Sequence, residues 1–187
     1  MPGEIELKVY ASSAIGRIPE DVYIGLAVSL IVGSLFFFWW KGLREGFRCT
    51  MLLLLAEWVF LILGTSVLFR ESGTNFRINL VPLSSYFDIA KSRYLLEAAA
   101  INILNVVMFI PVGLLSSFMV QGSRFKVTKR RWLWVLAFGT GLSVLVELLQ
   151  FILKRGLCEV DDVIHNMIGC VIGFAIYQLS TRLVKHA

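Results

Sequence analysis

Hydrophobic residues in this chain gather into five long runs that are separated by shorter, more polar segments. The runs are residues 22–40, 50–69, 101–120, 132–153 and 163–184. Each is close to the length of about 20 mainly apolar residues that an α-helix needs to cross a bilayer. The pattern therefore predicts an all-α protein, a polytopic membrane helix bundle with about five transmembrane helices.

Composition supports a membrane protein and leaves room for only one domain. Of the 187 residues, 57% are hydrophobic and 17% are charged, with a mean hydropathy of +0.76. A soluble domain carries about 25% charged residues. We expect one membrane domain over residues 22–187, preceded by an extracytoplasmic tail over 1–21. The tail has four acidic and two basic side chains, whereas a signal peptide begins with a short basic stretch.

Basic residues are concentrated on one side of the predicted bundle, because segments rich in Lys and Arg alternate along the chain with segments that are less basic. They are concentrated after the first run (Lys41, Arg44, Arg48), after the third (Arg124, Lys126, Lys129, Arg130, Arg131) and after the fifth (Arg182, Lys185). Because cytoplasmic loops are enriched in Lys and Arg, we expect the N-terminus outside and the C-terminus inside the cell. These loops account for the net charge of +5 without a nucleic-acid-binding module, so no nucleic-acid partner is expected. The three cysteines form no CxxC pair, and neither a disulfide framework nor a zinc site is implied.

The segment between the second and third runs, residues 70–100, mixes apolar and polar residues. Pro82 disfavours a helix through its position. We expect this outer segment to pack at the membrane surface, with a short interfacial helix near 88–100.

Polar residues inside the last two runs recur at helical spacing. Thr140, Ser143, Glu147, Gln150 and Lys154 are separated by 3, 4, 3 and 4 positions, and Asp162, Asn166, Gly169 and Gly173 by 4, 3 and 4. Such spacing places each set on one face of its helix. Because lipid cannot satisfy polar groups, both faces should point to protein or to a water-filled cavity.

The predicted topology brings the polar residues of four segments to one side of the membrane. Our hypothesis is a shared polar pocket that opens to the outer leaflet and contains Arg77, Asn79, Asn105, Glu147, Gln150, Arg155, Asp161, Asp162 and Asn166. Simpler interpretations remain open: Glu147 pairs with Arg77 or Arg155, and Asp162 caps its helix. His165 is expected at the water interface without a catalytic role. Structural roles are expected for Pro82, Pro111, Gly113, Gly169 and Gly173, the last two as small residues that let helices approach closely.

The order of these residues resembles the VanZ-like family of bacterial membrane proteins. Three motifs carry the resemblance: Arg77-x-Asn79-Leu80-x-Pro82; Asn105-x-x-x-Phe109-x-Pro111-x-Gly113; and Glu147-x-x-Gln150 with Arg155, Asp161-Asp162-x-x-x-Asn166-x-x-Gly169-x-x-x-Gly173. Together they run from about residue 77 to 177. This chain departs from the family pattern at Leu83, where Phe is frequent, at Glu159, where Asp is common, and at Arg155, which lies about one position early.

The resemblance implies the cellular process in which the protein acts, and it does not specify a chemical reaction. The family is named for a protein that lowers susceptibility to the lipoglycopeptide antibiotic teicoplanin without remodelling peptidoglycan termini. Its members are accessory proteins of the bacterial envelope. The resemblance therefore implies a role in glycopeptide resistance or envelope homeostasis, with membrane lipids, a lipid-linked cell-wall precursor or a lipoglycopeptide as partners.

Three functions are compatible with the sequence. In the first, the pocket binds an amphiphilic ligand: the arginines meet phosphate, the amides hydrogen-bond it, and the carboxylates meet hydroxyls, an amine or a cation. In the second, an intramembrane enzyme acts on a lipid-linked phosphate or sugar, with Glu147 and Asp161 or Asp162 as an acid/base pair or Mg²⁺ ligands. The third is a lipid flippase or transporter. The sequence carries no GxSxG nucleophile motif and no histidine cluster for zinc, so the first function is favoured and no metal or cofactor is expected.

Overall fold

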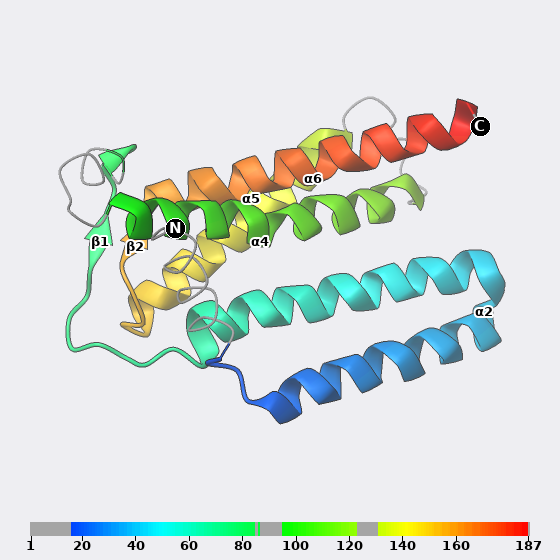
Figure 1. The fold of residues 1–187 in the computed structure, drawn as a ribbon, viewed down its shortest axis with the longest axis horizontal. Helices are drawn as coiled ribbons and strands as arrows, with labels where there is room; N and C mark the ends of the chain where they lie inside the picture. Colours follow the sequence, from blue (N-terminus) through cyan, green and yellow to red (C-terminus); the bar gives the residue numbers. More distant parts are fainter. Residues whose placement is uncertain (1–15, 85, 87–94, 123–130, 187) are drawn as a thin grey trace.

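The computed structural model describes residues 16–84, 86, 95–122 and 131–186 of the chain. The elements are the helix α2 (Glu20–Leu63), the π-helical turn η1 (Gly64–Leu68), the strand β1 (Ile78–Asn79), the helices α4 (Leu95–Gly122) and α5 (Arg131–Ile152), the strand β2 (Cys158–Glu159) and the helix α6 (Val160–His186). The helices run side by side as a bundle, and β1 and β2 lie together at one end of it (Figure 1). This architecture confirms the predicted all-α membrane bundle.

Helix α2 is a hairpin of two antiparallel arms (Figure 1). The arms meet at Gly42, whose φ of 75° lies in the left-handed region that glycine occupies without steric cost. Among the described residues, four helices are long and apolar enough to cross a membrane, and the first of these, Glu20–Leu68, contains both arms. The two arms correspond to the predicted spans 22–40 and 50–69, which accounts for the difference between four helices and about five spans.

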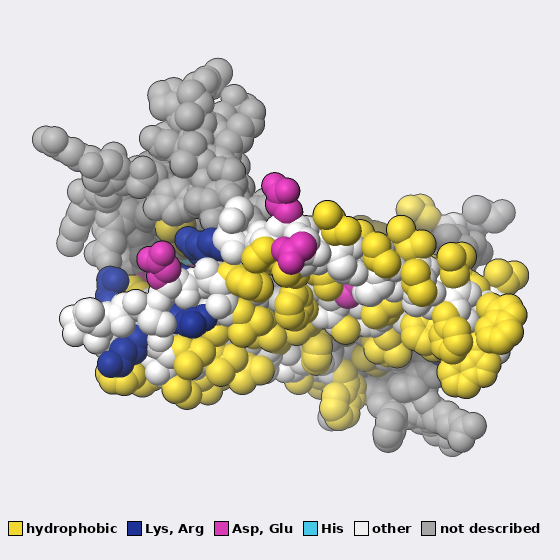
Figure 2. Space-filling view, turned by 90° about the horizontal axis from the view of Figure 1, so that it is seen from below, with side chains coloured by type: hydrophobic (Ala, Val, Ile, Leu, Met, Phe, Trp, Pro, Cys, Tyr) yellow, Lys and Arg dark blue, Asp and Glu magenta, His cyan; other side chains and the backbone are white. Residues whose placement is uncertain are grey.

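Apolar side chains cover most of the outer surface of α2, the side of the molecule that Figure 2 shows. Exposed large residues on α2 include Ile24, Leu35, Trp39 and Leu43. In water such a surface would be unfavourable, but around a membrane helix it contacts lipid chains. Lys and Arg side chains gather at the end of this face where β1 and β2 lie, on the left of Figure 2.

Helices α4 and α6 form the most extensive helix pair of the bundle. At Gly113, Gly169 and Gly173 a side-chain carbon would collide with backbone atoms of the facing helix, near Cys170, Val106 and Ile110 respectively. Small residues that let two backbones approach are typical of membrane helix interfaces. Pro111 lies inside α4, between Ile110 and Gly113 of this contact. A buried apolar cluster of Ile62, Val67, Phe109, Val112, Leu142, Val146 and Cys170 joins η1 and α2 to this pair and to α5.

The two short strands attach the outer segment to the last two helices. They pair in parallel, with Ile78 opposite Cys158 and Asn79 opposite Glu159. We call the end of the bundle that carries them the strand end. The expected interfacial helix near 88–100 falls partly outside the described residues, and from Leu95 onward the chain already belongs to α4.

The close contact of α4 and α6 is testable at Gly173. We expect Gly173→Leu to destabilise the protein by about 1–3 kcal/mol or to prevent folding, because the new side chain meets backbone that cannot move aside. The measurement is the melting temperature of the purified protein in detergent. The matched control is Gly141→Leu on α5, where nothing lies within 4 Å of the added carbon. Equal stability of the two variants would contradict the close helix contact.

Candidate functional site

Polar side chains are buried between the helices near the strand end. Glu147, Gln150, Asp161, His165 and Asn166 are each at most 6% exposed. They come from the last turns of α5 and the first turns of α6, because α5 runs toward the strand end and α6 leaves it. Two distinct polar regions result, a small cavity between the helices and a larger basic pocket at the surface.

The small region, which we call the carboxylate cavity, has a volume of about 30 Å³. Its polar lining residues are Ser66, Asn105, Glu147, Gln150, Asp162 and Asn166, and its apolar ones are Ile62, Met108, Phe109 and Val146. Four helical elements contribute, namely the second arm of α2 with η1, α4, α5 and α6. The space is sufficient for one or two water-sized groups and too small for a lipid head group.

Hydrogen bonds hold the side chains of the carboxylate cavity in place. Asn105 Nδ2 donates to Asp162 Oδ1 at 2.7 Å, and the backbone N–H of Glu159 donates to Glu147 Oε2 at 2.9 Å. Gln150 Nε2 donates to the carbonyl of Ser66 at 3.2 Å, and Asn166 Nδ2 donates to Ser143 Oγ at 2.8 Å. The alternative pairing of Glu147 with Arg77 or Arg155 is not found; among the described residues the one ion pair is Arg48–Glu45.

Asn79 and Asp161 hold the outer segment against α6. Asn79 Nδ2 donates to Ser84 Oγ at 2.8 Å and to Glu159 Oε1 at 3.1 Å. The backbone N–H of Leu83, whose φ is 62°, donates to Asp161 Oδ1 at 2.5 Å. A side-chain oxygen that satisfies this N–H stabilises a backbone conformation that a leucine rarely adopts. Both residues therefore position the turn around Pro82.

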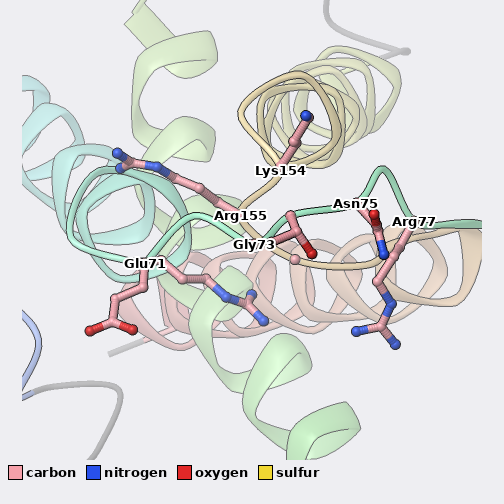
Figure 3. Close-up of a pocket in the computed structure, with 9 residues that line it drawn as sticks. Glu71, Gly73, Asn75, Arg77, Lys154 and Arg155 are labelled. Carbon is pink, nitrogen blue, oxygen red and sulfur yellow. The ribbon is translucent and has the colours of Figure 1, made fainter.

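The second region, the basic pocket, is an open hollow of about 380 Å³ at the strand end. It is lined by Arg70, Glu71, Gly73, Thr74, Asn75, Arg77, Lys154, Arg155 and Gly156. Figure 3 shows Arg77 and Lys154 on different segments, with their side chains pointing in opposite directions. Four cationic side chains against one carboxylate give the region a positive field.

Arg155 has a defined structural partner. Its Nη1 donates to the carbonyls of Val67 and Leu68 at 2.5 and 2.6 Å, and its Nε donates to Ser72 Oγ at 3.2 Å. In Figure 3 the Arg155 side chain extends toward the end of η1, the helical turn that contains Val67 and Leu68. A cation bonded to the last carbonyls of a helix satisfies them and interacts favourably with the helix dipole. Arg155 thereby connects η1 to the loop after α5.

Lys154 lies at the end of α5 in a left-handed conformation, with φ of 55°. The N–H of Lys154 bonds to the carbonyl of Phe151, and the N–H of Arg155 bonds to the carbonyl of Gln150. This is a Schellman ending, in which glycine usually takes the position that Lys154 holds. Lys154 Nζ lies 4.5 Å from the ring centre of Phe76, which sits 5.2 Å from the ring centre of Phe151.

Sequence reasoning did not single out Arg70, which the structure places between the two regions. Its guanidinium is half-buried beside Gly156, where a side chain would collide with it. Burial and then the nearby charge of Arg17 hold its pKa below the ordinary value, while Asp162 and Glu147 act in the opposite direction. No periodic pattern distinguishes Arg70 from the other cations of the outer segment, so only the fold identifies it.

Two further polar pairs were also missed. Glu57, in the second arm of α2, is 9% exposed and accepts a short hydrogen bond from Ser29 Oγ of the first arm. The sequence signal that could have identified Glu57 is a single carboxylate within an apolar run.

The expectation that His165 lies at the water interface is wrong. The His165 side chain is 3% exposed, and its Nε2 lies 2.7 Å from Tyr86 Oη.

The structure thus distributes the nine predicted pocket residues over three places. Asn105, Glu147, Gln150, Asp162 and Asn166 meet in the carboxylate cavity. Arg77 and Arg155 line the basic pocket, while Asn79 and Asp161 hold the turn between the outer segment and α6. The predicted single pocket is therefore two neighbouring regions of opposite charge at the same end of the bundle.

Comparisons with known proteins agree with the resemblance found in the sequence. A model of the VanZ/LLP1 family matches residues 22–181. Over 78 residues the chain is 36% identical to the Protein VanZ of Enterococcus faecium. The aligned part makes up 42% of this chain and 44% of that protein, so it spans less than half of the relative's length. No solved structure matches. Because the family model covers most of the chain, this protein belongs to the VanZ/LLP1 family.

Proposed function

We propose that this protein binds the anionic head group of a lipid-linked or amphiphilic ligand in the basic pocket, at the outer face of the bacterial plasma membrane. The observation that carries the proposal is a hollow of about 380 Å³ lined by four cationic residues, Arg70, Arg77, Lys154 and Arg155. Arg155 Nη1 and Nε already bond to protein oxygens, so Arg70 and Arg77 are the guanidinium groups proposed to meet the ligand. This volume falls in the range of small-molecule sites, roughly 300–1,000 Å³. Guanidinium groups match phosphate and carboxylate oxygens with two parallel hydrogen bonds.

The surroundings of the pocket suit a ligand that also has an apolar chain. Phe76, Leu80 and Val81 are exposed on the segment that lines the hollow, and Ile152 and Leu153 are exposed at the end of α5. Exposed apolar residues beside a charged pocket favour a molecule whose head group is held by charge and whose tail lies along the helices. A lipid-linked wall precursor and a lipoglycopeptide both have this character.

Family membership connects this binding to the cell envelope. The matched relative is a VanZ protein, and the VanZ-like family is named for lowered susceptibility to teicoplanin. We propose that this chain acts likewise, by holding the amphiphile or a wall precursor at the outer leaflet and so reducing the effect of the antibiotic on the envelope. The matched relative extends well beyond the aligned part, so the activity of the whole VanZ protein is carried over here only as part of this proposal.

The orientation that we propose for this function rests on the positive-inside rule. Ten of the 18 Lys and Arg residues follow the first, third and fifth hydrophobic runs, and five of these (Lys41, Arg44, Arg48, Arg131 and Arg182) are described at the end opposite the strand end. The strand end carries five described cations of its own (Arg17, Arg70, Arg77, Lys154 and Arg155), so the proposal depends on the denser basic segment between α4 and α5. We propose that the strand end faces outward, together with both termini of the α2 hairpin.

Cysteine labelling tests this orientation. On a background without native cysteines, we expect Thr74→Cys, at the strand end, to react with a membrane-impermeant maleimide in intact cells. Glu45→Cys, at the opposite end, should react only after the membrane is opened, because the reagent cannot cross the bilayer. Both positions are exposed in the structure, so burial does not separate them. The reverse labelling pattern would exclude a pocket on the outer face.

Native mass spectrometry tests the binding of anionic amphiphiles. We expect the purified protein to retain anionic phospholipid in preference to zwitterionic phospholipid. The double variant Arg70→Gln/Arg77→Gln should lower the apparent affinity about tenfold or more, since each charge-assisted hydrogen bond contributes about 1.5–3 kcal/mol.

The matched control is Arg44→Gln/Arg182→Gln, which removes two exposed cations from the opposite end of the bundle. Equal loss in both double variants would indicate non-specific attraction and contradict the pocket. Conversion of the bound lipid into a new product would instead support the enzyme alternative.

Susceptibility testing links the pocket to the proposed process. We expect expression of the chain in a susceptible Gram-positive host to raise the teicoplanin concentration that stops growth, and Arg70→Gln/Arg77→Gln to remove most of that effect at equal protein level. Because Arg77→Lys keeps the charge and loses the guanidinium fork, it should retain part of the effect. A wild-type chain that is expressed and inserted but leaves susceptibility unchanged would refute the teicoplanin role.

A further inference from the structure

The oxygen atoms of the carboxylate cavity are not fully used by the protein. The hydrogen bonds described above engage every amide NH₂ group of the cavity with a protein partner. They engage only one oxygen of each carboxylate, Oε2 of Glu147 and Oδ1 of Asp162. What remains available at the cavity is therefore a set of oxygens: Glu147 Oε1, Asp162 Oδ2, Gln150 Oε1 and Asn166 Oδ1.

Asn166 provides a second, independent observation at this space. Its side chain is 4% exposed and lines the cavity, yet its Oδ1 is buried without a hydrogen-bond partner. A buried acceptor without a partner costs about 1–3 kcal/mol. Nδ2 of the same group donates to Ser143 Oγ, so in this orientation of the amide the unpaired atom is an acceptor.

The charge of the cavity also lacks a direct counter-charge. Glu147 and Asp162 lie among apolar helices, and no Lys or Arg of the described residues forms an ion pair with either. Arg70 acts on both carboxylates through space. Glu147 is buried and Asp162 is half-buried. Two such carboxylates that share a site are costly unless a cation or a proton compensates them.

The size and the donor atoms narrow the choice of ligand. A cavity of about 30 Å³ accommodates a single ion and excludes any organic cation of appreciable size. Carboxylate and amide oxygens are the ligands that Mg²⁺ and Ca²⁺ prefer, whereas zinc favours nitrogen and sulfur. The geometry points to a binding site for one hard divalent cation, Mg²⁺ or Ca²⁺, coordinated by Glu147, Asp162, Gln150 and Asn166.

Such an ion would connect elements that are far apart in the sequence. Glu147 and Gln150 belong to α5, Asp162 and Asn166 belong to α6, and Asp162 is bonded to Asn105 of α4. Glu147 also accepts the N–H of Glu159 in β2, which pairs with β1 beside the basic pocket. The cation would therefore stabilise the helix ends on which the basic pocket is built, and it does not depend on what that pocket binds.

The test uses the full-length protein in zwitterionic lipid nanodiscs, where the lipid contributes no net negative charge. We expect Mg²⁺ or Ca²⁺ to raise the melting temperature on the order of 5 °C at about 100-fold excess over Kd, and EDTA to reverse the rise. Elemental analysis after desalting should find close to one divalent ion per chain.

Variants locate the ion. Glu147→Gln and Asp162→Asn should each abolish the thermal shift, while Asn166→Asp, which adds a third carboxylate, should strengthen binding. Glu57→Gln and Glu71→Gln are the controls, one for a buried and one for an exposed carboxylate outside the cavity, and both should keep the shift. If no divalent ion shifts the wild-type melting temperature, or if the shift persists without both cavity carboxylates, the site does not exist. A failure of anionic lipid binding in the earlier experiment would leave this result unaffected.

Discussion

The cost of placing carboxylates and amides inside a hydrocarbon layer governs the arrangement of this bundle. Lipid offers no hydrogen bonds, so each polar side chain of a spanning helix must find a partner within the protein. Here Glu147, Gln150, Asp162 and Asn166 all turn inward, to η1, α4, α5 and β2. The apolar residues are left on the outside, where they contact lipid.

Close packing of α4 and α6 makes this polar network attainable. Asn105 can reach Asp162 because the two backbones touch nearby, at Gly169 against Val106 and at Gly173 against Ile110. A larger residue at either glycine would collide with the backbone of α4, so the close approach of the two helices depends on these glycines. The apolar contact and the polar cavity are thus two consequences of the same small-residue interface.

The two polar regions have opposite charge and different exposure. The basic pocket is open and holds cations on short loops, whereas the carboxylate cavity lies between helices and is less open. Arg70 lies between them and is influenced by both Glu147 and Asp162. Under the functions proposed here, an anionic head group and a small cation would neutralise the two regions separately, each at its own depth in the outer half of the bundle.

The sequence by itself determined the helical membrane fold, the approximate number of spans and the family. It also predicted the inward faces of α5 and α6, because helical spacing fixes which side chains share a face. The meeting of Asn105 with Glu147, Gln150, Asp162 and Asn166 followed from their common depth, but their function stays a prediction. Only the tertiary structure separated Arg77 and Arg155 from the carboxylates, brought in Arg70 and buried His165 against Tyr86. The pairing of β1 with β2 and the left-handed backbone at Leu83 and Lys154 set the course of the segments that carry Arg77, Arg155 and Tyr86. Such features depend on contacts between residues about 80 positions apart, which local periodicity does not encode.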